Sequence, residues 1–105
     1  MKKTRNYHDD LIKRLKNVEF ALGYLNACLD EKEACVFLLG LRIVAQAHGG
    51  LKNLSKSTGL NREHLFRMLS KQGNPRLDNL RILADNFGWK LAFVKKNENT
   101  LRKAA

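Results

Sequence analysis

Proline and cysteine are scarce in this chain of 105 residues, which contains one Pro and two Cys. A single Pro together with only seven Gly excludes a collagen-like or linker-like protein. Two cysteines, Cys28 and Cys35, are too few for a disulfide scaffold, and their apolar surroundings predict two reduced thiols in the core. No other Cys or His lies near them at ligand spacing, so we expect no metal site.

Long apolar segments are also missing. The longest apolar run covers the eight residues 34–41 and ends at Arg42, whereas a membrane span needs about 20 residues. The charged N-terminus is not followed by the apolar stretch of a signal peptide, so we expect a cytoplasmic protein. With 44% hydrophobic and 29% charged residues, the chain is predicted to form a single globular domain over 1–105.

Acidic residues are only half as numerous as basic ones: 10 Asp and Glu face 20 Lys and Arg, a net charge of +10. The charge is +4 over residues 1–16, −2 over 17–50 and +8 over 51–105. A basic C-terminal half indicates a polyanionic partner. A surface of solvated lysines is the alternative, and charge alone does not decide between them.

Apolar residues recur at helical spacing through most of the chain, which predicts an all-α fold of five to six helices. Asn17 and Asn61 are suited to cap helix N-termini, and the Gly49–Gly50 pair and Gly88 are suited to end helices. The predicted helices cover residues 9–16, 18–31, 33–48, 51–57, 62–71 and 77–87.

The C-terminal residues differ in character from the helices. Residues 89–95 (WKLAFVK) are rich in aromatic and branched side chains and predict one β-strand. A single strand needs a partner, and a second copy of the chain is the simplest one. We expect residues 96–105 to form a loose tail.

Residues 51–70 have the spacing of a helix-turn-helix. Gly59 can adopt the positive φ that the sharp turn demands, and the small Ser55 allows the second helix to approach the first. Leu54 and Leu60 are predicted to anchor the first helix and the turn. The inner face of the second helix consists of Leu65, Met68 and Leu69. A generic helical hairpin is the alternative.

If that face is buried, other residues of the second helix are available to read base edges. Arg62 and Arg67 can each donate two hydrogen bonds to guanine, and Glu63 can accept one from cytosine. Phe66 either touches a thymine methyl or belongs to the core, and the sequence leaves both interpretations open.

Polar side chains suited to phosphate surround this helix. If a dimer neutralises about six phosphates, the log–log salt slope is near −5. The predicted backbone contacts are Lys52, Asn53, Lys56, Asn61, Ser70, Lys71, Asn74 and Arg76.

Catalytic patterns are weak. His8, Asp9 and Asp10 are consecutive, so on a helix they point in different directions and cannot converge on one ion. No nucleophile–base pair, phosphate-binding loop or zinc spacing occurs, and we expect neither an enzyme nor a cofactor.

Three stretches resemble the HigA-like addiction-module antidote proteins, which are antitoxins with a Cro/repressor-type (XRE) helix-turn-helix. They are YHDDLIKRLKN at 7–17, YLNACLDE at 24–31 and the run from Phe37 to Leu83. The most specific combination is Y-L-N-A, H-G-G-L, T-G-L-N-R-E and G-N-P, and the resemblance covers about residues 7–94.

We expect a homodimer that binds double-stranded DNA. The resemblance implies that the DNA is the operator of its own operon, which the protein represses, and that the protein neutralises a RelE/HigB-like toxin. Such toxins are basic ribonucleases, so a basic antitoxin would bind through apolar contacts or through its acidic 17–50 region. Residues 1–48 are the candidate toxin-binding region, and residues 49–88 form the helix-turn-helix core.

Candidate toxin anchors lie in residues 1–35. They are Tyr7, Leu11, Phe20 and Tyr24, for which core packing is the alternative. Two other functions compete with the antitoxin: a phage-type repressor without a toxin, and a helical adaptor that binds protein.

Overall fold

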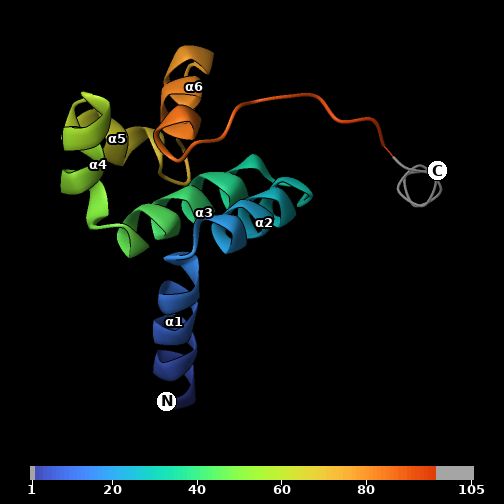
Figure 1. Ribbon diagram of the computed structural model, residues 1–105, viewed down its shortest axis with the longest axis vertical. Coiled ribbons are helices and arrows are strands. Elements are labelled where there is room, and N and C mark those ends of the chain that lie inside the picture. Colours follow the sequence, from blue (N-terminus) through green and yellow to red (C-terminus); the bar gives the residue numbers. More distant parts are fainter. Residues whose placement is uncertain (1, 97–105) are drawn as a thin grey trace.

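The computed structural model describes the backbone of residues 2–96 and the side chains of residues 7–96. Over this range it confirms the prediction of an all-helical fold. The helices are α1 (Lys2–Leu15), α2 (Val18–Leu29), α3 (Ala34–Ala47), α4 (Gly50–Thr58), α5 (Arg62–Met68) and α6 (Leu77–Asn86). In Figure 1, α3 crosses the middle, α1 projects downward, α4 and α5 lie at the left, and α6 stands above α3.

Helix α3 is central because it is apolar on nearly every side, so several helices can pack on it at once. It packs against α1, α2 and α4. Its buried residues include Leu38, Leu41 and Val44. A Cβ at Gly40 would lie 2.9 Å from the Cys28 Sγ atom, so α2 and α3 pack closely at this point. Both thiols are free, and Cys28 is buried as predicted, but Cys35 is only half-buried, so the prediction that it lies in the core is wrong.

The N-terminal helix is longer than predicted. It begins at Lys2 rather than at residue 9, so Asp9 and Asp10 lie within α1 and not in its first turn. A start at residue 9 would have placed both carboxylates in the first turn, where they favour the helix dipole. Residues 2–8 contain no Gly or Pro to prevent an earlier start.

Both predicted asparagine caps are confirmed. The Oδ1 atom of Asn17 accepts a hydrogen bond from the Phe20 N–H at 2.9 Å, and that of Asn61 accepts one from the His64 N–H at 3.0 Å. Helix α2 ends at Leu29, two residues before the predicted boundary.

The prediction that α5 extends to residue 71 is wrong, because the helix ends at Met68. Side chains take the carbonyls that a longer helix would use. The Ser70 hydroxyl donates to the Arg67 carbonyl at 2.7 Å, and Arg42 Nη2 donates to the Phe66 carbonyl at 2.8 Å.

The predicted strand over residues 89–95 is also wrong. Residues 89–96 follow α6 without forming a strand, since no other described segment pairs with them. The Trp89 N–H instead donates to the Ala84 carbonyl at 2.9 Å, and the Trp89 ring stacks on Phe87 at 4.9 Å between centroids. Of the predicted tail 96–105, all but residue 96 lies outside the described residues.

Within residues 2–96, no single helix is long and apolar enough to cross a membrane. The α3–α4 pair passes the same test of length and composition only when its two helices, bent by 91°, are taken together.

Truncating the fully buried Leu65 side chain should destabilise the fold strongly. We expect Leu65→Ala to lower the free energy of unfolding by about 2–5 kcal/mol, because it leaves a cavity beneath α5. The matched control is Leu29→Ala, since Leu29 is 58% exposed, and it should change stability by about 0.5 kcal/mol or less. Urea unfolding followed by circular dichroism measures both, and equal losses would contradict this packing.

Candidate nucleic-acid interface

Helices α4 and α5 are joined by a short turn that local hydrogen bonds fix. Gly59 ends α4 with φ +80°, a left-handed conformation that favours glycine, and its N–H donates to the Ser55 carbonyl at 2.9 Å. The Ser55 hydroxyl donates to the Leu60 carbonyl, and the Thr58 hydroxyl donates to the Leu54 carbonyl at 2.7 Å. The turn therefore has the conformation that the sequence predicted around Gly59.

The inner face of α5 and of the residue after it is buried. Leu65 and Leu69 are inaccessible to solvent, and Met68 is 4% exposed. Leu60 is partly buried against the same core. These contacts fix which side of α5 faces outward.

All four residues predicted to read bases are accessible to solvent on α5. Arg62, Glu63, Phe66 and Arg67 are exposed. Phe66 is 56% exposed, so it does not belong to the core, which answers the question that the sequence left open. The arrangement gives α5 an outer surface with two guanidinium groups, one carboxylate and one aromatic ring.

Arg42 contacts this helix from α3, and the sequence analysis missed it. Its Cζ atom lies 4.3 Å from the centroid of the Phe66 ring, and its Nη2 atom donates to the Phe66 carbonyl. One feature of the sequence could have identified it: Arg42 is the one charged residue of the apolar helix α3.

The predicted phosphate contacts fall into two groups. The first group is exposed and consists of Lys52, Lys56, Lys71 and Asn74. The second group makes hydrogen bonds within the chain and consists of Asn53, Asn61, Ser70 and Arg76. Members of the second group would have to give up or share these bonds to contact a phosphate.

The electrostatics of this region favour an anion. Residues 51–76 contain six Lys and Arg but a single acid, Glu63. At its edge, Arg76 Nε lies 3.2 Å from Asp78 Oδ1, and this hydrogen bond lowers the pKa of the Asp78 carboxyl. Because both side chains are exposed, the pair contributes little to stability.

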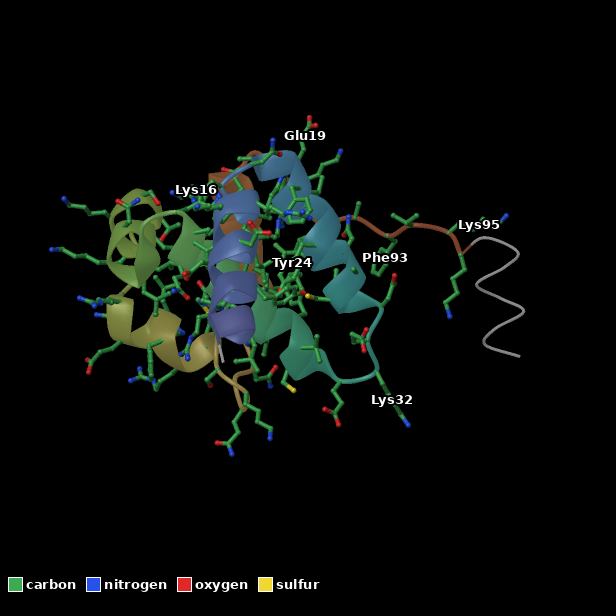
Figure 2. The ribbon with its side chains drawn as sticks, turned by 90° about the horizontal axis from the view of Figure 1, so that it is seen from below. Lys16, Glu19, Tyr24, Lys32, Phe93 and Lys95 are labelled. Atoms are coloured by element: carbon green, nitrogen blue, oxygen red, sulfur yellow. The ribbon has the colours of Figure 1, made fainter. Side chains whose placement is uncertain are left out.

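The four candidate toxin anchors do not form one exposed set. Leu11 and Tyr24 pack against the core, and burial raises the pKa of the Tyr24 hydroxyl. Tyr7 is 73% exposed, and Phe20 is 39% exposed with the Arg14 Cζ atom 5.9 Å from its ring centroid. Figure 2 shows Tyr24 beside α1 and Phe93 well away from it.

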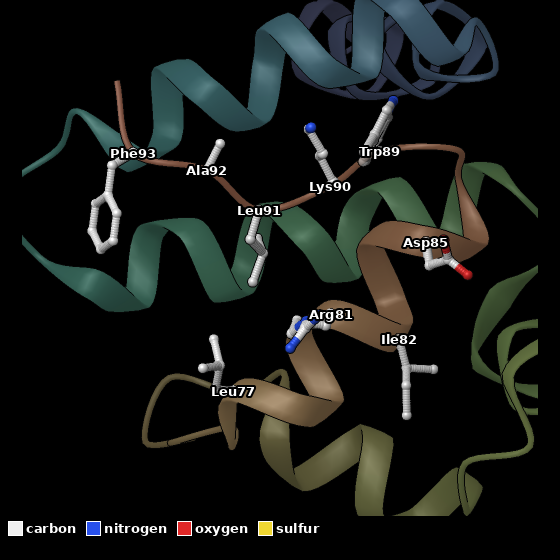
Figure 3. Close-up of a pocket in the computed structure, with 9 residues that line it drawn as sticks. All are labelled: Leu77, Arg81, Ile82, Asp85, Trp89, Lys90, Leu91, Ala92 and Phe93. Atoms are coloured by element: carbon white, nitrogen blue, oxygen red, sulfur yellow. The ribbon is translucent and has the colours of Figure 1, made fainter. Parts of the chain in front are cut away.

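An apolar groove of about 770 Å³, which the sequence analysis did not predict, separates α6 from the segment that follows it. Leu77 and Ile82 of α6 line one side, and Leu91 and Phe93 line the other. In Figure 3, Leu91 and Phe93 point to one side of the segment while Lys90 and Ala92 point to the other. The Phe93 side chain is fully exposed, so it makes no packing contact within the described chain.

No group of three or more His, Cys, Asp or Glu side chains with metal-binding geometry occurs in the part of the chain that the structure describes. His8, Asp9 and Asp10 are exposed on α1.

Comparison with family models identifies the family of the chain. The model of a family described as "probable addiction module antidote protein" matches residues 5–95, which is most of the chain. No curated protein matches significantly, and no solved structure does.

Proposed function

The chain belongs to the family of probable addiction module antidote proteins, and on this premise we propose that it is a HigA-like antitoxin that also represses transcription. In this proposal α4 and α5 form a Cro/repressor-type helix-turn-helix, and α5 enters the major groove of operator DNA. The family implies a toxin partner in general. We propose that this partner is a RelE/HigB-like ribonuclease.

The observation that carries the DNA-binding proposal is the outer face of α5. Arg67 is exposed opposite the buried Leu65, and Arg62 is exposed at the start of α5, so both guanidinium groups are available to guanine O6 and N7. Lys52 and Lys56 are exposed on α4, which packs against α5, and both are available to phosphate oxygens. Base-reading and backbone-contacting residues are therefore carried by adjacent helices.

The two kinds of contact predict different mutant phenotypes. Arg67→Ala should weaken binding to a specific duplex by about 1–3 kcal/mol and relax selectivity at one base pair. Lys52→Ala should weaken binding to all duplexes alike and reduce the salt slope by about 1. Fluorescence anisotropy with a duplex selected from a random pool, and with a random duplex, measures both effects. Equal losses for Arg67→Ala on the two duplexes would make Arg67 a phosphate contact instead.

For the toxin we propose a surface on α1 and α2 centred on Tyr7 and Phe20. Their exposure supports this assignment, whereas Leu11 and Tyr24 support it from within the core. Acidic residues that suit a basic ribonuclease lie in and after α2: Glu19, Asp30, Glu31 and Glu33 are exposed. Residues 1–48 would then bind toxin while residues 49–88 bind DNA.

Co-expression with the protein encoded by the adjacent reading frame tests this surface. The wild-type chain should restore growth and co-purify with that protein. The double variant Tyr7→Ala/Phe20→Ala should restore growth poorly, because it removes two apolar anchors. Arg67→Ala is the matched control and should restore growth fully. A wild-type chain that neither rescues growth nor binds the adjacent product would contradict the toxin assignment.

We further propose that the protein forms a homodimer in which two copies pack against each other through the groove beside α6. Leu77 is 65% exposed, and the fully exposed Phe93 lies on the rim of the same groove. Arg81 and Asp85 are four residues apart on α6, so two antiparallel copies of this helix can pair each arginine with the partner's aspartate. A dimer would place two copies of α5 on one duplex.

Phe93→Ser should convert the dimer to a monomer without loss of protomer stability, since Phe93 is 107% exposed. Tyr7→Ser, at 73% exposure on α1, is the control and should remain dimeric. Analytical ultracentrifugation distinguishes these states. A wild-type chain that sediments as a monomer, or a Phe93→Ser variant that stays dimeric, would contradict this interface.

A further inference from the structure

Arg42 occupies an unusual position for a cation. It is the one charged residue on α3, the helix at the centre of the fold, and its side chain is half-buried. Its Nε atom is buried without a hydrogen-bond partner among the described residues. Burying a guanidinium is costly unless it is hydrogen-bonded, so the contacts that Arg42 does make are expected to compensate for this cost.

Both of these contacts go to α5. The Nη2 atom donates to the Phe66 carbonyl at 2.8 Å, and the guanidinium carbon lies 4.3 Å from the Phe66 ring centroid. The Phe66 carbonyl belongs to the last turn of α5, where unpaired carbonyls carry partial negative charge and favour a cation. Within the described residues, this is the one side-chain hydrogen bond that reaches α5 from another helix.

The peptide group to which Arg42 donates its hydrogen bond joins Phe66 to Arg67. The Phe66 carbonyl carbon is bonded to the backbone nitrogen of Arg67, so the hydrogen bond restrains the orientation of the Arg67 backbone. A bidentate contact with guanine tolerates only about 0.5 Å of displacement. A helix of seven residues has few bonds of its own to maintain that accuracy.

We propose that Arg42 is a positioning residue for sequence recognition: it orients α5, and with it Arg67, although it lies on α3 outside the helix-turn-helix. This inference rests on the proposed DNA-binding function. Arg42 covers one face of the Phe66 ring and leaves the remainder exposed for a thymine methyl. Arg42 therefore affects the choice of sequence through α5 rather than through a contact of its own.

The test compares affinities of the full chain for two probes at fixed salt: a duplex that the wild type selects from a random pool, and a random duplex. Arg42→Ala should reduce the ratio of the affinity for the selected duplex to that for the random duplex about tenfold. This is the effect expected when α5 loses one charged hydrogen bond and one cation–π contact. Affinity for the random duplex and its salt slope should not change, since the proposed role gives Arg42 no contact with phosphate.

Two conservative variants and a matched control sharpen the comparison. Arg42→Lys retains the charge, and Arg42→Gln retains a neutral donor, so each should restore part of the ratio. Arg14→Ala removes an arginine that also lies over a phenylalanine ring, with its Cζ atom 5.9 Å from the Phe20 centroid, but on α1. It should leave the ratio unchanged.

A second measurement needs no DNA. Amide hydrogen exchange of α5 in the free protein should be faster in Arg42→Ala than in the wild type, and unchanged in Arg14→Ala. Should Arg42→Ala fail to fold, Arg42→Lys and Arg42→Gln provide both measurements.

The outcomes separate this inference from the function on which it rests. A wild type that discriminates between the duplexes, with Arg42 variants that discriminate equally well, overturns the positioning role alone. A salt slope that falls by about 1 in Arg42→Ala makes the residue a phosphate contact and also overturns it. A wild type that binds both duplexes equally overturns the proposed DNA-binding function, and the inference with it.

Discussion

Burial of one face of α5 is the constraint on which the proposed interface depends. A seven-residue helix is not stable alone in water, so α5 owes both its existence and its orientation to tertiary packing. Leu65 and Leu69 are fully buried, and this fixes the rotation of the helix about its axis. Once that rotation is fixed, Arg67 must face outward, while Arg62 is exposed at the first position of the helix. The same apolar contacts that stabilise the domain therefore determine which side chains a DNA duplex would meet.

The chain divides its surface into regions of different chemistry. The cations of α4 and α5 lie at one end of α3, while the acidic residues of the 17–50 region lie mainly around the turn between α2 and α3. Helix α3 contacts α1, α2 and α4, so one apolar helix supports both regions. An antidote protein that binds a toxin and an operator needs two surfaces of this kind. Membership in the antidote family and the basic outer face of α5 agree with this division of roles.

Local interactions made much of this fold predictable. The period of apolar residues predicted the order of the helices. The caps Asn17 and Asn61 follow from their own side chains, and the positive φ of Gly59 follows from its lack of a Cβ. The wrong predictions concern features that depend on residues far apart in the sequence. Arg42 is 24 residues from the Phe66 carbonyl that it binds, so a local pattern does not predict its contribution to the end of α5.

The prediction of a strand near Phe93 was wrong because β-propensity does not supply a neighbouring strand. Exposure separated Tyr7 from the core-packed Leu11, a distinction that depends on which helices lie nearby.

The most direct test of the central claim is a titration of the isotope-labelled chain with its selected duplex, followed by backbone amide chemical shifts. The account predicts the largest shift changes at residues 61–71, with smaller ones at Lys52 and Lys56, and little change along α1. Changes confined to α1 and α2, with α5 unaffected, would contradict the claim that α5 reads DNA.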